Sequence, residues 1–100
     1  KDVPLEGKWN LVVKGPTGAE PTVLVIEHKD GVLTGTQTGQ GTTSAVTEVT
    51  VNGNQVSWIN HVTKPLKLKV TFTGEIQGNT MSGKCKAGFV GSFKFTAVKE

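Results

Sequence analysis

Turn signals built on glycine, asparagine and proline divide this chain into short segments, and this punctuation restricts the folds that it can adopt. Asn52-Gly53-Asn54 and Gln77-Gly78-Asn79 are tight-turn sequences, and Lys29-Asp30-Gly31 is a further hairpin signal. Pro65 sets a strand boundary, because proline cannot donate to a ladder of hydrogen bonds. No segment of useful length repeats apolar residues with the period of a helix. We therefore expect a chain built from strands alone.

The segments between these signals predict eight strands. Their approximate ranges are 7–14, 22–28, 32–38, 45–51, 55–63, 66–76, 80–86 and 91–98. Each strand can pair with the one before it, and closing such a meander removes both unpaired edges. The expected fold is an all-β, eight-stranded antiparallel up-and-down barrel. We expect one domain over residues 1–100, since a chain of this length supports one modest core.

Alternation along the strands separates inward from outward side chains. The expected inward residues are Gly7, Trp9, Leu11 and Val13, then Val56, Trp58, Asn60 and Val62, then Leu66, Leu68, Val70 and Phe72, and finally Met81, Gly83, Cys85, Gly91, Phe93, Phe95 and Ala97. The strand at 22–28 is apolar on both faces, which leaves its register open and makes it a candidate contact for a partner subunit.

The expected interior is apolar, and it has two possible states. A barrel of eight strands is just wide enough to be filled by side chains or to hold one small ligand. In the second case Trp58, Phe72, Met81 and Phe93 line the pocket, and Asn60 orients the ligand. The alternative for Asn60 is a strand-end residue whose amide bonds to the backbone.

A short pattern of a large apolar residue, serine or threonine, and glycine recurs at 33–35, 72–74 and 81–83. Glycine inside a strand usually marks a bend or a bulge, which small barrels need. The alternative is that these glycines clear room for a ligand. We favour the bends.

Gly7-Lys8-Trp9 opens the first expected strand and resembles the Gly-x-Trp signature of the calycins, which include lipocalins, fatty-acid-binding proteins and avidins. Residues 5–12 are similar to the first strand of fatty-acid-binding proteins, and 30–36 to the second hairpin of avidins. The whole chain resembles a small barrel domain of bacterial exported proteins, sometimes carried beside hydrolase domains. The resemblance implies a barrel with a possible apolar ligand, a structural role for Trp9 at one barrel end, and a periplasmic or secreted location.

Several positions depart from these families. Leu11 stands where avidins place an inward asparagine that binds biotin, and the chain contains neither tyrosine nor arginine. Fatty-acid-binding proteins hold the ligand carboxylate with arginine and tyrosine, and lipocalins pack an arginine over the tryptophan. The resemblance therefore implies no specific ligand.

Reactive side chains are few and scattered. His28, His61 and Cys85 lack the spacing of a metal site, and an inward cysteine in apolar surroundings is usually inert. Glu27 and Glu48 are better explained as solvated strand residues than as paired carboxylates. We expect no metal, no cofactor and no conventional catalytic constellation.

The net charge is +3, and every basic residue is a lysine. On the outer face of the last three expected strands lie Lys67, Lys69, Lys84, Lys86 and Lys94, opposed mainly by Glu75. This cluster is either an anionic docking patch or a solvated, aggregation-resistant face, and we favour the second. The absence of arginine and of exposed aromatic residues argues against nucleic acid, and a membrane surface is also disfavoured.

The sequence thus supports one leading hypothesis and two alternatives. The first is a non-enzymatic barrel that binds a small hydrophobic molecule. The second is an accessory or interaction domain with a filled core, whose surface contacts an attached domain or a second copy. The third is a small barrel enzyme of the cyclase or isomerase type that acts through the shape of its cavity.

Overall fold

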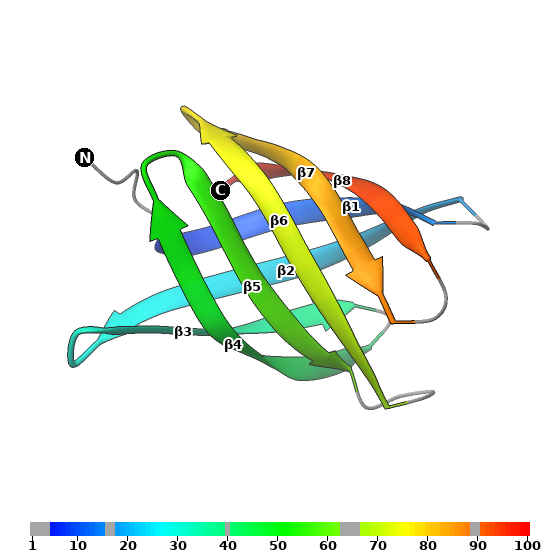
Figure 1. The fold of residues 1–100 in the computed structure, drawn as a ribbon, viewed down its shortest axis with the longest axis horizontal. Helices are drawn as coiled ribbons and strands as arrows, with labels where there is room; N and C mark the ends of the chain where they lie inside the picture. The colour runs from blue at the N-terminus through cyan, green and yellow to red at the C-terminus, as the bar shows by residue number, and fades with distance from the viewer. Residues whose placement is uncertain (1–4, 16–17, 40, 63–66, 89–90) are drawn as a thin grey trace.

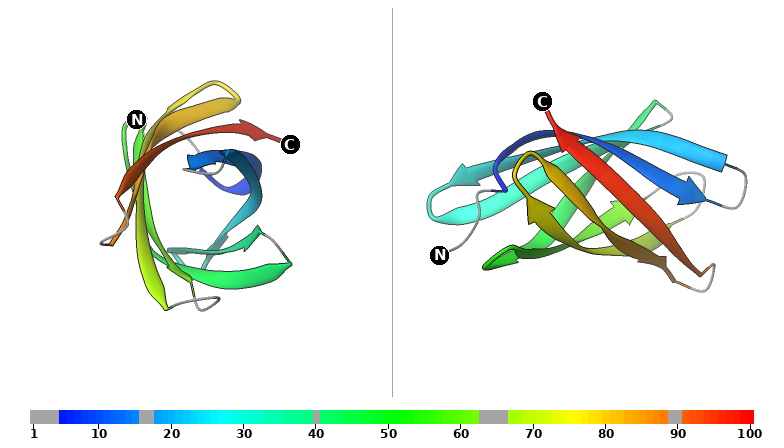
Figure 2. Two further views of the ribbon diagram at one scale, coloured as in Figure 1. Left: turned by 90° about the vertical axis from the view of Figure 1, so that its right-hand side faces the viewer. Right: turned by 90° about the horizontal axis from the view of Figure 1, so that it is seen from above.

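The chain forms a closed barrel in which every strand pairs antiparallel with its neighbours in sequence (Figure 1). The computed structural model describes residues 5–15, 18–39, 41–62, 67–88 and 91–100. Its strands are β1 (Gly7–Gly15), β2 (Gly18–Lys29), β3 (Val32–Gly39), β4 (Thr42–Asn52), β5 (Gln55–Val62), β6 (Leu68–Gln77), β7 (Thr80–Ala87) and β8 (Ser92–Lys99). Strand β8 pairs with β1, from Trp9 opposite Lys99 to Lys14 opposite Lys94, and this pairing closes the ring (Figure 2). The predicted eight-stranded meander barrel is confirmed.

The barrel has two different ends. At one of them, the hairpin end, two-residue turns at 30–31, 53–54 and 78–79 join the strands, as the turn signals predict. Asp30 and Gly31 have φ angles of 52° and 78°, which is the type I′ pattern that matches the twist of paired strands. At the other end, the loop end, the chain passes from β1 to β2, β3 to β4, β5 to β6 and β7 to β8. In Figure 1 the β2–β3, β4–β5 and β6–β7 hairpins lie on the left, at the opposite side of the barrel from the loop end.

Two strands begin earlier than predicted. Strand β2 starts at Gly18 rather than at 22, and β4 starts at Thr42 rather than at 45. Pro21 lies within β2 opposite Val12 of β1, whereas the pairing of β2 with β3 begins only at Val23. Proline is tolerated there because its missing N–H interrupts no ladder with β3. The predicted boundary at Pro65 and the predicted inward position of Leu66 lie outside the described residues.

Aromatic rings fill the middle of the barrel. Trp58 and Phe72 stack with their centroids 5.0 Å apart, and Phe95 packs edge-on against both at 5.8 and 5.3 Å. These arrangements are the favourable ones for aromatic pairs. The predicted inward alternation is confirmed in β1, β5, β6, β7 and β8 for the described residues. Leu24 and Ile26 are buried, which settles the register of β2 that the sequence left open.

The glycines of the recurring pattern allow neighbouring strands to approach closely. Gly74 and Gly83 stand opposite each other in β6 and β7. A Cβ atom on Gly83 would overlap the carbonyl oxygen of Thr73, and one on Gly74 would lie 3.0 Å from the ring of Phe95. The space beside these glycines is thus occupied by backbone and by core, which argues against the alternative that they clear room for a ligand.

A bulge bends β4 beside the aromatic core. The pairing of β4 with β5 shifts between Thr47 and Thr50, so that Glu48 and Val49 together stand opposite Trp58. Glu48 has a φ of 52°, the left-handed conformation that a bulge of this kind requires and that glycine adopts most easily. Its side chain is exposed, as expected for a solvated carboxylate.

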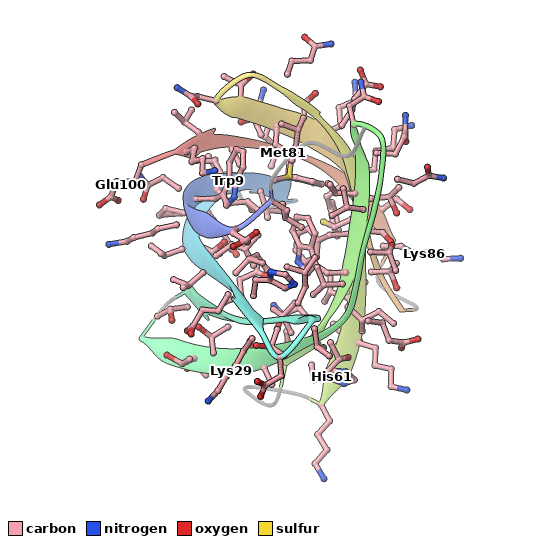
Figure 3. The ribbon with its side chains drawn as sticks, turned by 90° about the vertical axis from the view of Figure 1, so that its left-hand side faces the viewer. Trp9, Lys29, His61, Met81, Lys86 and Glu100 are labelled. Carbon is pink, nitrogen blue, oxygen red and sulfur yellow. The ribbon has the colours of Figure 1, made fainter. Side chains whose placement is uncertain are left out.

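The hairpin end is closed by Trp9 and the segment before β1. Trp9 is fully buried, and its Nε1–H donates to the carbonyl oxygen of Leu5 at 2.9 Å. The ammonium group of Lys99 lies 5.6 Å from the centroid of the indole ring, within reach of a cation–π interaction. Figure 3 shows Trp9 and Met81 pointing into the barrel, whereas Lys29, Lys86 and Glu100 point away from it.

Candidate functional site

A polar pocket of about 140 Å³ lies at the loop end of the barrel. Its walls come from β2, β3, β4 and β5, and its lining residues are Glu20, Pro21, Thr22, Gln37, Gly39, Thr42, Ser44, Asn60 and Val62. Near the loop end, the inward side chains of these strands are mostly polar. Farther from the loop end, the same strands contribute Leu24, Val46 and Trp58 to the core. The polar pocket therefore lies between the apolar core and the loop end of the barrel.

Gln37 forms the boundary between the pocket and the core. It is only 3% exposed, since the alternation of β3 places its side chain inside. Its Nε2–H donates to Oγ1 of Thr22 at 3.1 Å, and its Oε1 accepts the indole N–H of Trp58 at 3.4 Å. Both ends of the amide are satisfied, as a buried polar group requires. Gln37 is not among the pocket residues predicted from the sequence.

Asn60 forms the wall of the pocket on β5. It is 7% exposed, and its Oδ1 accepts a hydrogen bond of 2.6 Å from the hydroxyl of Ser44. The same hydroxyl lies 3.2 Å from the carbonyl oxygen of Gln37. The partner of Asn60 is thus a side chain of β4 and not the backbone, contrary to the alternative considered from sequence. Among the described residues, its amide nitrogen has no hydrogen-bond partner, which leaves two N–H donors for another molecule.

The other predicted pocket residues lie elsewhere in the barrel. Trp58 and Phe72 belong to the packed aromatic stack, and Met81 is buried toward the hairpin end. Phe93 is half-buried near the start of β8 and is not part of the pocket lining. The structure therefore places Asn60 in the pocket and connects Trp58 to it through Gln37, but it does not bring the five predicted residues together around one space.

The pocket presents a defined chemical environment. Donors come from Asn60 and from the hydroxyls of Thr22 and Thr42, Ser44 supplies a hydroxyl oxygen whose proton is bonded to Asn60, and Glu20 supplies a carboxylate. Pro21 and Val62 supply apolar surface. A cavity of roughly 150 Å³ accepts benzene, so a space of about 140 Å³ suits one small ring. The pocket can hold such a ring, and polar atoms on the ring can form hydrogen bonds with the Asn60 amide and the hydroxyls.

Among the residues that the structure describes, the titratable groups outside the pocket do not gather into one cluster. Burial raises the pKa of the Cys85 thiol, so this cysteine stays protonated and weakly nucleophilic. His61 lies on the outer side of β5 with its Nε2 2.6 Å from Oγ1 of Thr47. Within the described ranges, no three histidine, cysteine or acidic side chains gather in a way that would hold a metal ion. The same ranges contain no helix that could cross a membrane.

Comparison of the chain with protein-family models, with curated proteins and with solved structures finds no match.

Proposed function

We propose that this protein is a calycin-like binding barrel that takes a small molecule in the polar pocket at its loop end. The observation that carries the proposal is the amide group of Asn60 in the pocket wall. Its oxygen is bonded to Ser44, while its nitrogen lines the pocket without a partner among the described residues. Because no described buried side-chain nitrogen or oxygen lacks a partner, this nitrogen is open to the pocket, where a ligand acceptor can replace water as its hydrogen-bond partner.

The pocket favours a ligand with an apolar body and one acceptor. Val62 and Pro21 suit a ring or a short aliphatic group, and Asn60 suits a carbonyl or hydroxyl oxygen. The ligand is therefore small and mainly hydrophobic, with a single polar group that fixes its orientation. No catalytic role is assigned to the lining residues.

A second candidate function rests on the packed middle of the barrel. Trp58, Phe72 and Phe95 leave the aromatic layer closed, which is what a filled barrel acting as an accessory or interaction domain requires. This candidate needs no ligand in the pocket, so binding measurements separate the two.

Calorimetric titration with benzamide, cyclohexanone and benzene tests the proposal. We expect the two carbonyl compounds to bind saturably with one molecule per barrel, and benzene to bind more weakly because it leaves Asn60 unpaired. Asn60→Leu removes the donor and should weaken benzamide binding roughly tenfold or more. Asn52→Leu, the same change at an exposed position at the hairpin end, serves as the matched control and should leave affinity unchanged.

Two outcomes would contradict the proposal. Equal affinity of the Asn60→Leu variant and the parent protein for benzamide would remove Asn60 from the site. Failure of all three compounds to bind a folded protein would favour the filled interaction domain.

A further inference from the structure

Closure of the barrel aligns lysines from both ends of the chain into one row. Lys14 of β1 stands directly opposite Lys94 of β8, and Lys94 stands directly opposite Lys84 of β7. All three side chains are exposed on the outer wall. Directly opposed residues in antiparallel strands have Cβ atoms roughly 4.5–5.5 Å apart, so three like charges lie side by side.

No carboxylate among the described residues forms an ion pair with a lysine of the row. In the described part of the chain, the ion pairs are Lys8 with Glu100 and His28 with Glu6, and none includes a lysine of the row. Glu75 lies nearby on β6, but its two carboxylate oxygens accept from the side chains of Gln55 and Gln77. Like charges in direct opposition destabilise a sheet, and no described ion pair offsets this cost in the row.

A groove of about 270 Å³ follows this row. Besides the three lysines, its lining includes the hydroxyls of Ser82 and Thr96, which oppose each other in β7 and β8. The lining thus combines three ammonium groups with two hydroxyls, and among the described residues it contains no carboxylate. Ammonium groups and hydroxyls donate to anionic oxygens, which makes this set of donors complementary to an oxyanion.

We propose that the groove formed by Lys14, Lys84 and Lys94 is a binding site for a multiply charged phosphate- or sulfate-type group. A compact lysine ammonium acts as a point charge, which suits a tetrahedral oxyanion and does not require the planar geometry of a carboxylate. Neutralising the row also removes its self-repulsion, so the bound anion stabilises the fold as well as the complex. The site lies on the outer wall and does not depend on the pocket inside the barrel.

Titration with inorganic pyrophosphate, followed by ¹⁵N NMR at constant ionic strength, tests the site. We expect saturable shifts at the amides of the groove, and no such shifts when chloride replaces pyrophosphate. Lys94→Gln removes the middle charge and should weaken binding roughly five- to tenfold, given the Coulomb energy at these separations in water. Lys29→Gln, which removes an exposed lysine at the hairpin end, is the control of equal charge and should leave affinity unchanged.

The thermal stability of the Lys94→Gln variant provides a second test of the proposal. Because the substitution relieves repulsion, its midpoint of thermal unfolding should be higher than that of the parent at low salt, and the difference should shrink as salt is added.

Three outcomes would overturn the proposal. Shifts that grow linearly with concentration and match those of chloride would indicate screening alone. Equal weakening by Lys94→Gln and Lys29→Gln would indicate a response to net charge. Co-sedimentation with phosphatidylglycerol–phosphatidylcholine vesicles without pyrophosphate binding would indicate a diffuse membrane-attracted face and not a site.

Discussion

The indole N–H of Trp58 donates to Oε1 of Gln37 at 3.4 Å, and this contact joins the aromatic core to the polar pocket at the loop end. The ring of Trp58 also stacks on that of Phe72, and Gln37 also donates a hydrogen bond to Thr22 in the pocket wall. Any change in the pocket that moves Gln37 therefore changes the environment of one of the two tryptophans.

Replacing Gln37 with leucine should destabilise the fold. The change leaves the buried N–H of Trp58 without an acceptor, which costs about 1–3 kcal/mol. Urea unfolding followed by circular dichroism measures the loss. The same substitution at exposed Gln77 should stay within about 0.5 kcal/mol, and a similar loss at both positions would show that the buried hydrogen bond is not its source.

The two phenylalanines of β8 should differ in their contribution to stability. Phe95 is 1% exposed and contacts two other aromatic rings, so Phe95→Ala should cost about 3–5 kcal/mol. Phe93 is only half-buried, so Phe93→Ala should cost less, about 1–2 kcal/mol, in proportion to the apolar area that it buries. Equal losses in denaturant unfolding would contradict the description of the core as centred on Phe95.

Alanine should be tolerated at one strand glycine and not at another. A Cβ on Gly83 would overlap the backbone of Thr73, so Gly83→Ala should force β6 and β7 apart and cost at least about 1–3 kcal/mol. A Cβ on Gly15 would meet its nearest neighbour, the carbonyl oxygen of Gly18, at an ordinary 3.7 Å, and Gly15→Ala should change stability by less than about 1 kcal/mol. If thermal unfolding shows the two variants to be equally stable, the close approach of β6 and β7 is not required.

The buried thiol of Cys85 should make stability depend on alkaline pH. Burial raises its pKa in the folded state, whereas the unfolded chain ionises near the ordinary thiol value of about 8.5. Above that pH the unfolded chain loses the thiol proton while the native state keeps it, and this difference favours unfolding. The free energy of unfolding is therefore highest below the unfolded pKa and falls as the pH rises through the folded pKa. Cys85→Ala lacks the thiol, so the difference in unfolding free energy between parent and variant should narrow above about pH 9. A constant difference would contradict the assignment.

The sequence predicts the barrel well because its alternation is strongest where the core is most apolar. In β8, Phe93, Phe95 and Ala97 alternate with polar residues, and that pattern leaves one face for the interior. Whether the interior is hollow or filled depends on rotamers, and the stacking of Trp58 on Phe72 has no signature in sequence.

The pocket and the lysine row show two different reasons why sites escape sequence analysis. Gln37 shares the inner face of β3 with Leu33 and Gly35, because every second residue of a strand faces the same side. Most residues of this strand are polar or small on both faces, so the alternation is hard to recognise in the sequence. Lys14 gave no such signal. Its proximity to Lys94 exists only because β1 and β8 close the barrel, and local periodicity carries no information about that pairing.

The most direct test of the central claim follows the two indole N–H resonances of Trp58 and Trp9 during titration with benzamide. Trp58 is bonded to Gln37 in the pocket wall, whereas Trp9 is bonded to Leu5 at the hairpin end. Binding at the loop end predicts a saturable shift of the Trp58 resonance and an unmoved Trp9 resonance. If benzamide binds and only the Trp9 resonance shifts, or if neither resonance moves, the pocket of Gln37, Ser44 and Asn60 is not the binding site.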